Sequence, residues 1–250
     1  VRPEADVMTE AGQVQPDGNR FHAALATPGS RNVIAECKRR SPSQGIIRPD
    51  YSPGQIAVSY QQAGAKAVSV LTEPTFFDGS LDHLRAVRRA VDLPVLRKDF
   101  IVTAYQLLES VAAGADAVLL IVAALDDREL QSLSSQAEGL GLAVLVEIHD
   151  RMELKRAVDA GARIVGVNNR NLHTLSVDLD ATRVLIDEIP ADVIGVAESG
   201  LQTTGDLREL EQLGYRAFLI GEVLMRNPDP GEKLRELLGD MEQDTSFDLH

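Results

Sequence analysis

The chain has 250 residues, of which 44% are hydrophobic and 25% charged, so it has ordinary globular composition and enough apolar material for one large core. Its net charge of −13 argues against binding to nucleic acid or anionic lipid, although a local cluster of Lys, Arg and backbone N–H groups could still hold an anionic substrate. The single cysteine excludes an intrachain disulfide, no apolar run approaches the ~20 residues of a membrane helix, and the first ten residues lack the apolar core of a signal peptide, so we expect a cytoplasmic protein.

The first part of the chain, residues 1–20, shows little helical pattern and contains Gly12, Pro16 and Gly18, which predicts a short irregular extension. Eight short apolar, β-rich runs follow, at residues 33–37, 67–71, 94–96, 117–122, 143–146, 164–167, 193–197 and 217–220. Most of these runs are continuously apolar rather than alternating, as is typical of parallel strands that are covered on both faces. Residues 241–250 are expected to form a polar tail.

Segments with a helical pattern separate these runs, at residues 53–64, 79–91, 104–114, 126–141, 150–161 and 204–214. Helix starts are indicated at Ser52, Thr103, Asp126 and Asp150, each followed three positions later by Gln or Glu. Helix ends are indicated by glycines shortly before the next strand, and "AGAKAVSV", "AGADAVLL" and "AGARIVGV" are near-copies of one helix-to-strand joint.

Eight strand–helix units in a chain of this length predict an α/β protein with a single (β/α)8 TIM barrel over residues 21–240. A doubly wound open sheet is the alternative, but that fold usually has fewer strands and a less even repetition.

In such a barrel, chemistry gathers where the strands end. The polar residues expected there are Glu36, Lys38, Thr72, Glu73, Lys98, Glu147, Asn168, Arg170, Glu198 and Ser199. Because side chains alternate along a strand, Glu36 and Lys38 share one face while Cys37 points to the other and fills space under the helices. By the same alternation, Asp99 points away from Lys98 and is expected to be a loop or capping residue.

Each pair of charges could instead be a structural ion pair, since buried charges need partners whatever their function. Two lysines and three glutamates at one end of one barrel favour an active site, because such an assembly costs stability. His149 follows Glu147 by two residues and raises the question of a metal, but no third ligand has suitable spacing, so we expect none.

The loops after the last two strands read "AESGLQTTG" and "LIGEVLM". Ser199-Gly200 and Gly221-Glu222 could present backbone N–H groups to a phosphate, with positive charge from Arg170 and Lys38 at the rim. The alternative is that these are two ordinary glycine turns.

Three reactions fit these residues. The first is a Schiff-base aldolase with Lys98 or Lys38 as nucleophile. The second is acid–base chemistry on a sugar phosphate, with a lysine as proton donor and a glutamate as acceptor. The third is glycoside hydrolysis by paired carboxylates, which would leave the phosphate cradle unused.

Eight blocks in order, from about residue 21 to 238, carry a family resemblance: "VIAECKRRSPSQG", "SVLTEPTFFDGS", "LPVLRKDFI", "GADAVLLI", "LVEIHD", "VGVNNRNLHT", "AESG" and "LIGEVLM". Together they closely resemble indole-3-glycerol phosphate synthase of tryptophan biosynthesis, and "LPVLRKDFI" and "NNRNL" are the most specific. The resemblance implies closure of 1-(2-carboxyphenylamino)-1-deoxyribulose 5-phosphate to an indole, with loss of CO2 and water and without cofactor or metal.

The resemblance also implies a role for each matching residue. Lys98 would be the general acid and Glu147 the carboxylate that handles the proton transfers of dehydration. Glu36 would orient the lysine and substrate hydroxyls, Lys38 would pair with the anthranilate carboxylate or the phosphate edge, and Asn168 would hold hydroxyls. The residues expected to bind the phosphorylated end are Ser41, Arg170, Ser199, Gly200, Gly221 and Glu222, the last by its backbone N–H. Those expected around the aromatic ring are Phe76, Phe100, Leu119, Leu172 and Glu198.

Two features depart from the usual family pattern. The extension before the barrel is short, where the family carries a longer, charged helical one, and Gln44 stands where the family often has a basic residue. For partners we expect a small phosphorylated substrate, no nucleic acid and no membrane. We expect a monomer, with association with another enzyme of the tryptophan pathway left open.

Overall fold

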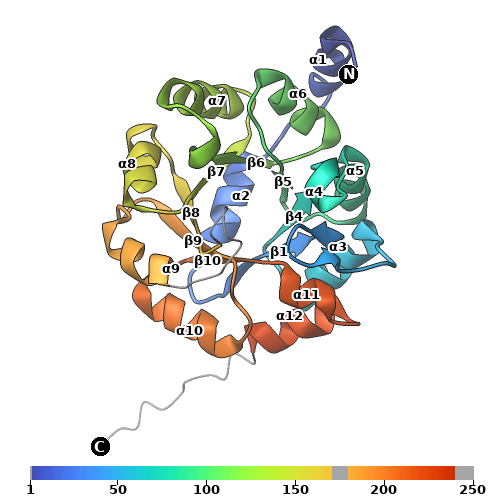
Figure 1. Cartoon of the computed structure of the whole chain (residues 1–250). Helices are drawn as coiled ribbons and strands as arrows, with labels where there is room; N and C mark the ends of the chain where they lie inside the picture. The colour runs from blue at the N-terminus through green and yellow to red at the C-terminus, as the bar shows by residue number, and fades with distance from the viewer. Residues whose placement is uncertain (1, 171–179, 240–250) are drawn as a thin grey trace, which may run out of the picture.

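A computed structural model describes residues 2–170 and 180–239 of the chain. Eight parallel strands form a closed barrel, in the neighbour order β1-β10-β9-β8-β7-β6-β5-β4 (Figure 1). The barrel strands are β1 Asn32–Cys37, β4 Ala67–Leu71, β5 Val95–Lys98, β6 Ala117–Ile121, β7 Ala143–Ile148, β8 Ile164–Asn168, β9 Ile194–Glu198 and β10 Ala217–Ile220. All eight predicted strands are therefore confirmed, with ends that differ by at most two residues.

Helices surround the barrel and cover the outer faces of its strands (Figure 1). In chain order, the helices after β1 are α3 Pro53–Ala63, α4 Pro74–Phe77, α5 Leu81–Ala90, α6 Ala104–Ala113, α7 Asp127–Gly139, α8 Arg151–Asp159, α9 Asp180–Leu185, α10 Thr204–Leu213, α11 Glu222–Arg226 and α12 Pro230–Leu238, with short 3-10 turns at Val122–Ala124 and Ile186–Glu188. The short α4 buries no residue and lies at the open end of the barrel instead. No helix in this described part is long and apolar enough to cross a membrane.

The local signals for helix ends mostly act as predicted. Thr103, Asp126 and Asp150 each accept a hydrogen bond from the backbone N–H three residues on. Ser52 is an exception, because its side chain makes no capping hydrogen bond and Pro53 begins the helix instead. Glycines 64, 114, 141, 161 and 214 all have left-handed φ between 84° and 113°, as expected at these joints.

The expectation of an irregular extension was wrong. Residues 1–20 contain α1 (Glu4–Ala11) and the start of α2 (Gly18–Leu25). Pro3 precedes α1, which packs beside α6 (Figure 1) and has Val7 and Ala11 as its buried residues. Two buried residues in a single eight-residue helix are too weak a pattern to find from sequence.

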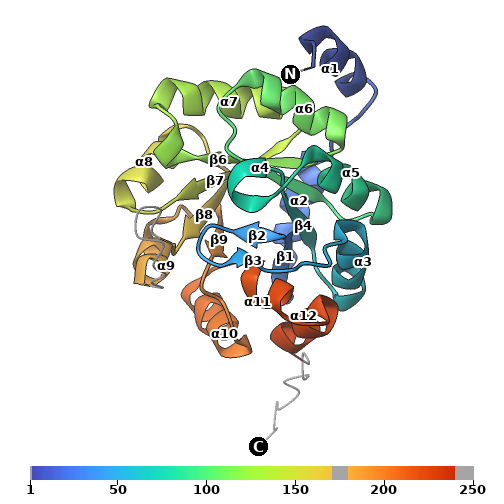
Figure 2. The same cartoon turned by 45° about the vertical axis from the view of Figure 1, so that its right-hand side comes forward.

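Helix α2 closes the N-terminal end of the barrel and is seen through the barrel centre in Figure 1. Phe21 and Leu25 on α2 are fully buried and pack with the inward side chains of the strands. The side chain of Asn32, the first residue of β1, donates to the carbonyls of Leu25 and Arg216 and so connects helix α2 to the barrel. The opposite end remains open, and the small hairpin of β2 (Arg40–Ser41) and β3 (Gly45–Ile46) lies over it beside α4 (Figure 2).

Candidate active site

Lys98 lies at the centre of a group of charged side chains at the C-terminal end of the barrel. Its Nζ atom is 2.6 Å from Glu198 Oε2, 3.7 Å from Glu147 Oε2 and 3.8 Å from Glu36 Oε2. Those carboxylates come from β9, β7 and β1, so barrel closure brings together residues up to 162 positions apart in the sequence. One partly buried ammonium group therefore faces three buried carboxyl groups.

The second lysine, Lys38, pairs with Glu36 at 2.7 Å, which confirms that the two side chains share the inward face. Cys37 between them is fully buried on the helix side and packs in the outer core, as predicted. Burial raises the pKa of the Cys37 thiol, so this side chain behaves as an apolar filler.

The charges in this group set each other's protonation. Burial disfavours the Lys98 ammonium, but Glu198, Glu147 and Glu36 outweigh burial and raise the pKa of Lys98. Burial also opposes ionisation of Glu36, yet Lys38 and Lys98 together lower its pKa. At neutral pH, Lys98 is thus a charged ammonium group and Glu36 is a carboxylate.

Glu198 is fully buried beneath the cavity and does not line its wall, contrary to the expectation that it flanks the aromatic ring. One of its oxygens meets Lys98, and the other has no hydrogen-bond partner among the residues described. Gly166 on β8 makes the room for it, since a Cβ added there would lie 2.0 Å from Glu198 Oε1.

We expect Gly166→Ala to lower activity by about 10²-fold, because the methyl group forces the Glu198 carboxyl away from its 2.6 Å contact with Lys98. Steady-state kinetics would measure the loss. Gly139→Ala is the matched control, since a Cβ at that position on α7 meets nothing within 4 Å. Wild-type kinetics in Gly166→Ala would contradict the role assigned to this glycine.

The Glu198 carboxyl also predicts a dependence of stability on pH. Burial raises its pKa from 4.5 to about 7, with Lys98 opposing this shift and Glu147 and Glu36 adding to it. Between these two pH values the folded state holds a proton that the unfolded chain has released. The stabilisation from this group is therefore complete below pH 4.5 and is lost as the pH rises through about 7.

We expect the unfolding temperature to fall between about pH 5 and pH 8, with Glu198→Gln removing part of this slope. Calorimetry on both proteins would measure it, with Glu138→Gln, an exposed position on α7, as the control. An identical slope in wild type and Glu198→Gln would show that Glu198 does not titrate in this range.

Asn168, at the end of β8, joins the carboxylates to the next loop. Its Nδ2 donates to Glu147 Oε1 at 2.9 Å, and its Oδ1 accepts from the backbone N–H of Arg170 at 3.0 Å. His149 lies 3.6 Å from Glu147 and pairs with Glu153 at 3.1 Å. Within residues 2–170 and 180–239, no group of three or more His, Cys, Asp or Glu is arranged to hold a metal ion.

The loops after β9 and β10 form the other side of the site. Ser199 has a φ of +66°, which is uncommon outside glycine and is typical of backbone held in place at functional sites. Gly200 follows it at +84°. Gly221 also accepts no larger residue, because an added Cβ would lie 2.3 Å from Glu36 Oε1. The backbone at both loops can therefore approach a ligand closely.

Arginine side chains join these loops to the hairpin after β1. Arg170 lies 3.2 Å from Glu222 and 3.4 Å from the Ser43 hydroxyl, and Arg226 pairs with Glu222 at 3.1 Å. Arg226 also donates to the side-chain oxygen of Gln44. Gln44 therefore takes part in holding the hairpin over the site as a hydrogen-bond acceptor, which a basic residue could not be.

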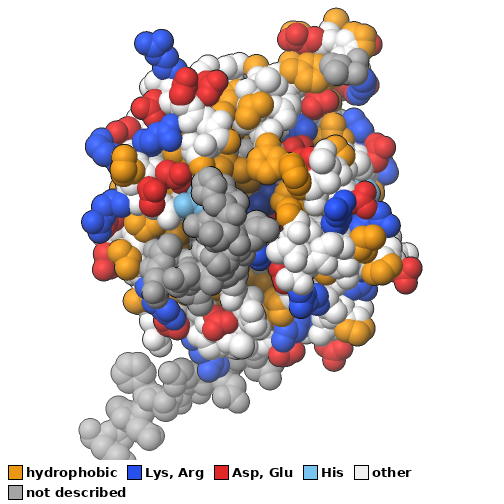
Figure 3. Space-filling model, viewed as in Figure 1, with side chains coloured by type: hydrophobic (Ala, Val, Ile, Leu, Met, Phe, Trp, Pro, Cys, Tyr) orange, Lys and Arg blue, Asp and Glu red, His pale blue; other side chains and the backbone are white. Residues whose placement is uncertain are grey.

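These residues surround a cavity of about 760 Å³. In the space-filling view, Lys and Arg side chains are visible inside the central hollow and hydrophobic side chains lie along its upper rim (Figure 3). The apolar part of the cavity wall consists of Leu71, Phe77, Phe100, Leu119, Ile121, Leu201, Leu219, Ile220 and Val223.

The cavity brings together most of the residues expected from the sequence. It is lined by Glu36, Lys38, Lys98, Phe100, Leu119, Glu147, Asn168, Arg170, Ser199, Gly200, Gly221 and Glu222. Phe76 is 52% exposed and does not line it, whereas Phe77 does. Ser41 is buried outside the wall, with its hydroxyl 3.4 Å from that of Ser43. Leu172 lies outside the described residues.

Three contributions were missed from the sequence: Phe77 in the wall, Gly166 beneath Glu198, and Arg226 at the hairpin. Arg226 had a usable signal, because it follows Glu222 by four residues on a helix and so shares its face. Phe77 and Gly166 had none, since the direction of a four-residue helix and the space beside a strand depend on the assembled barrel.

Comparisons with known proteins show the family to which the chain belongs. The family model for indole-3-glycerol phosphate synthase matches residues 1–237. The indole-3-glycerol phosphate synthase of Albidiferax ferrireducens is 51% identical over 220 residues, covering 87% of this chain and 83% of that protein. That of Acetivibrio thermocellus is 49% identical over 216 residues, covering 86% and 83%.

Among solved structures, the likeness concerns the fold alone. 3-Hexulose-6-phosphate synthase has a TM-score of 0.67 at 15% identity, covering 82% of this chain and 97% of that one. Thiamine phosphate pyrophosphorylase from Pyrococcus furiosus has a TM-score of 0.64 at 16% identity, covering 82% and 93%. With the whole barrel matched by the family model and by relatives near 50% identity, the chain belongs to the indole-3-glycerol phosphate synthase family, the carboxy-lyases of tryptophan biosynthesis.

Proposed function

We propose that the protein closes 1-(2-carboxyphenylamino)-1-deoxyribulose 5-phosphate to indole-3-glycerol phosphate, with Lys98 as general acid and Glu147 as general base. One observation carries this proposal: a charged lysine faces three buried carboxyl groups at a cavity that has an apolar wall on one side and arginines with the glycine loops at Ser199-Gly200 and Gly221 on the other. Such a cavity suits a substrate with an aromatic ring at one end and a phosphate at the other.

In the proposed reaction, the Lys98 ammonium hydrogen-bonds to the substrate carbonyl and protonates it as the aromatic carbon attacks. The new carbon–carbon bond is followed by loss of CO2, which restores aromatic character to the ring. Glu147 would then take the proton from the ring CH2 next to the nitrogen, while Lys98, reprotonated from water, would protonate the hydroxyl so that it leaves as water. Placing a donor and an acceptor within 3.7 Å of each other lets one site serve both steps.

The remaining side chains would hold the substrate. Glu36 would orient Lys98 and substrate hydroxyls, Lys38 would pair with the anthranilate carboxylate or the phosphate edge, and Asn168 would hold hydroxyls. Phe100 and Leu119, together with Phe77, would flank the aromatic ring.

For the phosphate, Arg170 would supply charge and the loops at Ser199-Gly200 and Gly221-Glu222 would supply backbone N–H groups. The Glu222 carboxylate contacts both Arg170 and Arg226, so an incoming phosphate would compete with it for these cations. Ser41 would act indirectly, through the hairpin that carries Ser43.

The Schiff-base alternative conflicts with the charges around Lys98. A nucleophilic lysine needs a lowered pKa so that its neutral amine is available. Here the carboxylates raise the pKa of Lys98, which favours a proton donor over a nucleophile. Lys38 is held in an ion pair with Glu36 at 2.7 Å, which occupies the nitrogen that would have to attack.

Incubation of the purified protein with the carboxyphenylamino-deoxyribulose phosphate tests the function directly. We expect indole fluorescence to rise with release of one CO2 per indole, against little protein background because the chain has no tryptophan. Absence of indole would refute the proposal. A lysine adduct after borohydride treatment with a sugar phosphate would support the aldolase instead.

A further inference from the structure

A second group of charges lies on the opposite face of β5, directly behind Lys98. Arg97 and Asp99 flank Lys98 in the chain. Arg97 does not line the cavity and hydrogen-bonds to Thr72 after β4 and to the Gln106 carbonyl of α6. Asp99, by contrast, lines the cavity and also contacts Arg97. Arg97 is only 3% exposed, although it carries a permanent charge. The proposed reaction gives neither residue a task.

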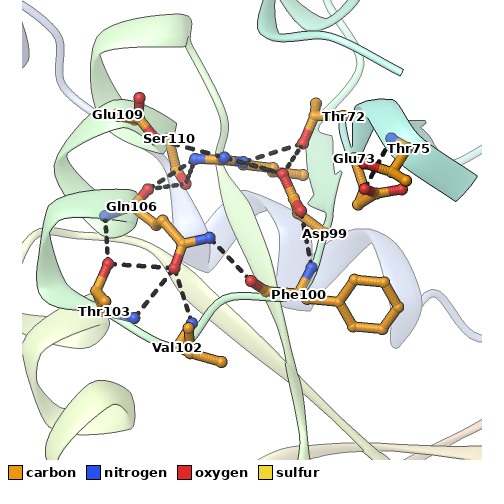
Figure 4. A network of polar contacts seen from close by, with 11 residues as sticks. Thr72, Glu73, Thr75, Asp99, Phe100, Val102, Thr103, Gln106, Glu109 and Ser110 are labelled. Atoms are coloured by element: carbon orange, nitrogen blue, oxygen red, sulfur yellow. Dashed lines mark hydrogen bonds and ion pairs between the residues drawn. The ribbon is translucent and has the colours of Figure 1, made fainter. Parts of the chain in front are cut away.

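Every part of the Arg97 guanidinium group has a partner. Its Nη2 lies 2.9 Å from Asp99 Oδ2 and 3.6 Å from Glu109 Oε2. Its Nε donates to the Thr72 hydroxyl at 3.1 Å, which in turn donates to Asp99. Its Nη1 donates to the Gln106 carbonyl at 2.8 Å and to the Ser110 hydroxyl at 3.2 Å (Figure 4). The end of β5 is thereby bonded to β4 and to α6.

The same network holds the backbone on both sides of Lys98. The Lys98 carbonyl accepts from the backbone N–H of Thr72 at 3.1 Å. Asp99 Oδ1 accepts from the Phe100 N–H at 2.8 Å, and Gln106 Nε2 donates to the Phe100 carbonyl at 2.8 Å. The backbone on both sides of the Lys98 side chain is therefore fixed by hydrogen bonds to β4 and α6.

Position matters for Lys98 because two of its three carboxylate contacts are long. Glu147 and Glu36 lie at 3.7 and 3.8 Å, close to the distance at which an ion pair ceases to be one. A displacement of the lysine by less than about 1 Å would break these contacts, and misplacements of that size cost about 10²-fold in rate. A buried ion pair adds little stability over apolar residues, so packing alone gives weak reason for Arg97 and Asp99.

We propose that Arg97 and Asp99 are positioning residues that hold the Lys98 ammonium in register with the carboxylates of β1, β7 and β9. The proposal rests on the function proposed above for Lys98. It extends the active site behind β5 to Arg97, which does not line the cavity and is joined to the cavity-lining Asp99 at 2.9 Å.

The structure offers a matched control at the other end of the same strand. Asp116 pairs with Arg88 at 2.8 Å and accepts from the backbone N–H of Val95, the first residue of β5, at 2.9 Å. The side chains of Asp99 and Asp116 are 10% and 11% exposed. Asp99→Asn and Asp116→Asn thus each remove one negative charge from an ion pair with an arginine, and the two aspartate side chains are equally buried.

We expect Asp99→Asn to lower kcat by about 10²-fold with KM changed less than about threefold, and Asp116→Asn to lose similar stability while keeping wild-type kcat. Unfolding temperature and steady-state kinetics on both variants would test this. If the two variants had equal kcat while Lys98→Met was inactive, the Arg97–Asp99 network would contribute to stability only and would not position Lys98.

Thr72→Val serves as a milder variant if Asp99→Asn does not fold. It removes the hydroxyl that links Arg97 to Asp99 and keeps the shape of the side chain. We expect kcat to fall several-fold at constant KM, and an unchanged kcat would overturn the positioning role. If Lys98→Met itself retained activity, the proposed function of Lys98 would fail instead, so the two failures remain distinguishable.

Discussion

Lys98→Met is expected to reduce indole formation by about 10²–10⁴-fold, the range that a positioned general acid contributes. Methionine preserves the length and packing of the side chain but has no proton to donate to the substrate carbonyl. Indole fluorescence with the carboxyphenylamino-deoxyribulose phosphate would measure the loss. Activity above a few per cent of wild type would refute the assignment.

The same substitution should lower stability in a pH-dependent way. Removing one partner of a buried ion pair typically costs about 3–5 kcal/mol, unless the group left behind changes protonation. Without Lys98, Glu198 loses the cation that opposed the rise in its pKa, so it stays protonated to higher pH. The destabilisation should therefore be smaller at about pH 6 than at about pH 8. Lys155→Met on the exposed face of α8 is the control and should change neither property.

Glu147→Gln is expected to lower kcat by about 10²–10⁴-fold for a different reason. In the wild type, Asn168 Nδ2 donates to Glu147 at 2.9 Å. Glutamine keeps an oxygen that can accept this hydrogen bond, but it cannot take up a proton. It also removes a carboxyl group from a site that holds three around Lys98, so we expect the folded state to be retained.

Steady-state kinetics and the unfolding temperature of Glu147→Gln would separate these effects. The matched control is Glu153→Gln, one turn into α8, which loses a contact with His149 without touching the cavity. If Glu153→Gln lost activity and Glu147→Gln kept it, the assignment of the proton transfers to Glu147 would be wrong.

Much of the barrel could be predicted because its signals are local. Eight short β-rich runs, most of them continuously apolar, predicted all eight strands, and side-chain alternation predicted that Glu36 and Lys38 share a face with Cys37 turned outward. Knowledge of where barrel strands end then placed Lys98, Glu147 and Asn168 around one opening. Each of these inferences needs only a few neighbouring residues.

The remaining features depend on distances across the closed barrel. Alternation indicates that Glu198 points inward, but its 2.6 Å contact with Lys98 depends on strand register and on the absence of a side chain at Gly166. Phe77 lines the cavity and Phe76 does not, and this depends on the orientation of the four-residue helix α4 in the folded protein. Helix α1 was missed because its stability comes from packing on α6, not from its own sequence.

The central claim is that Lys98 performs chemistry and is more than the partner of a buried carboxylate. The double variant Lys98→Met/Glu198→Gln tests this claim most directly, because it replaces the 2.6 Å pair by neutral side chains of similar size and should recover stability lost in Lys98→Met. We expect this double variant to unfold at a temperature close to that of wild type and to form no indole in the fluorescence assay. Indole formation that recovers together with stability would show instead that Lys98 serves only as an ion-pair partner.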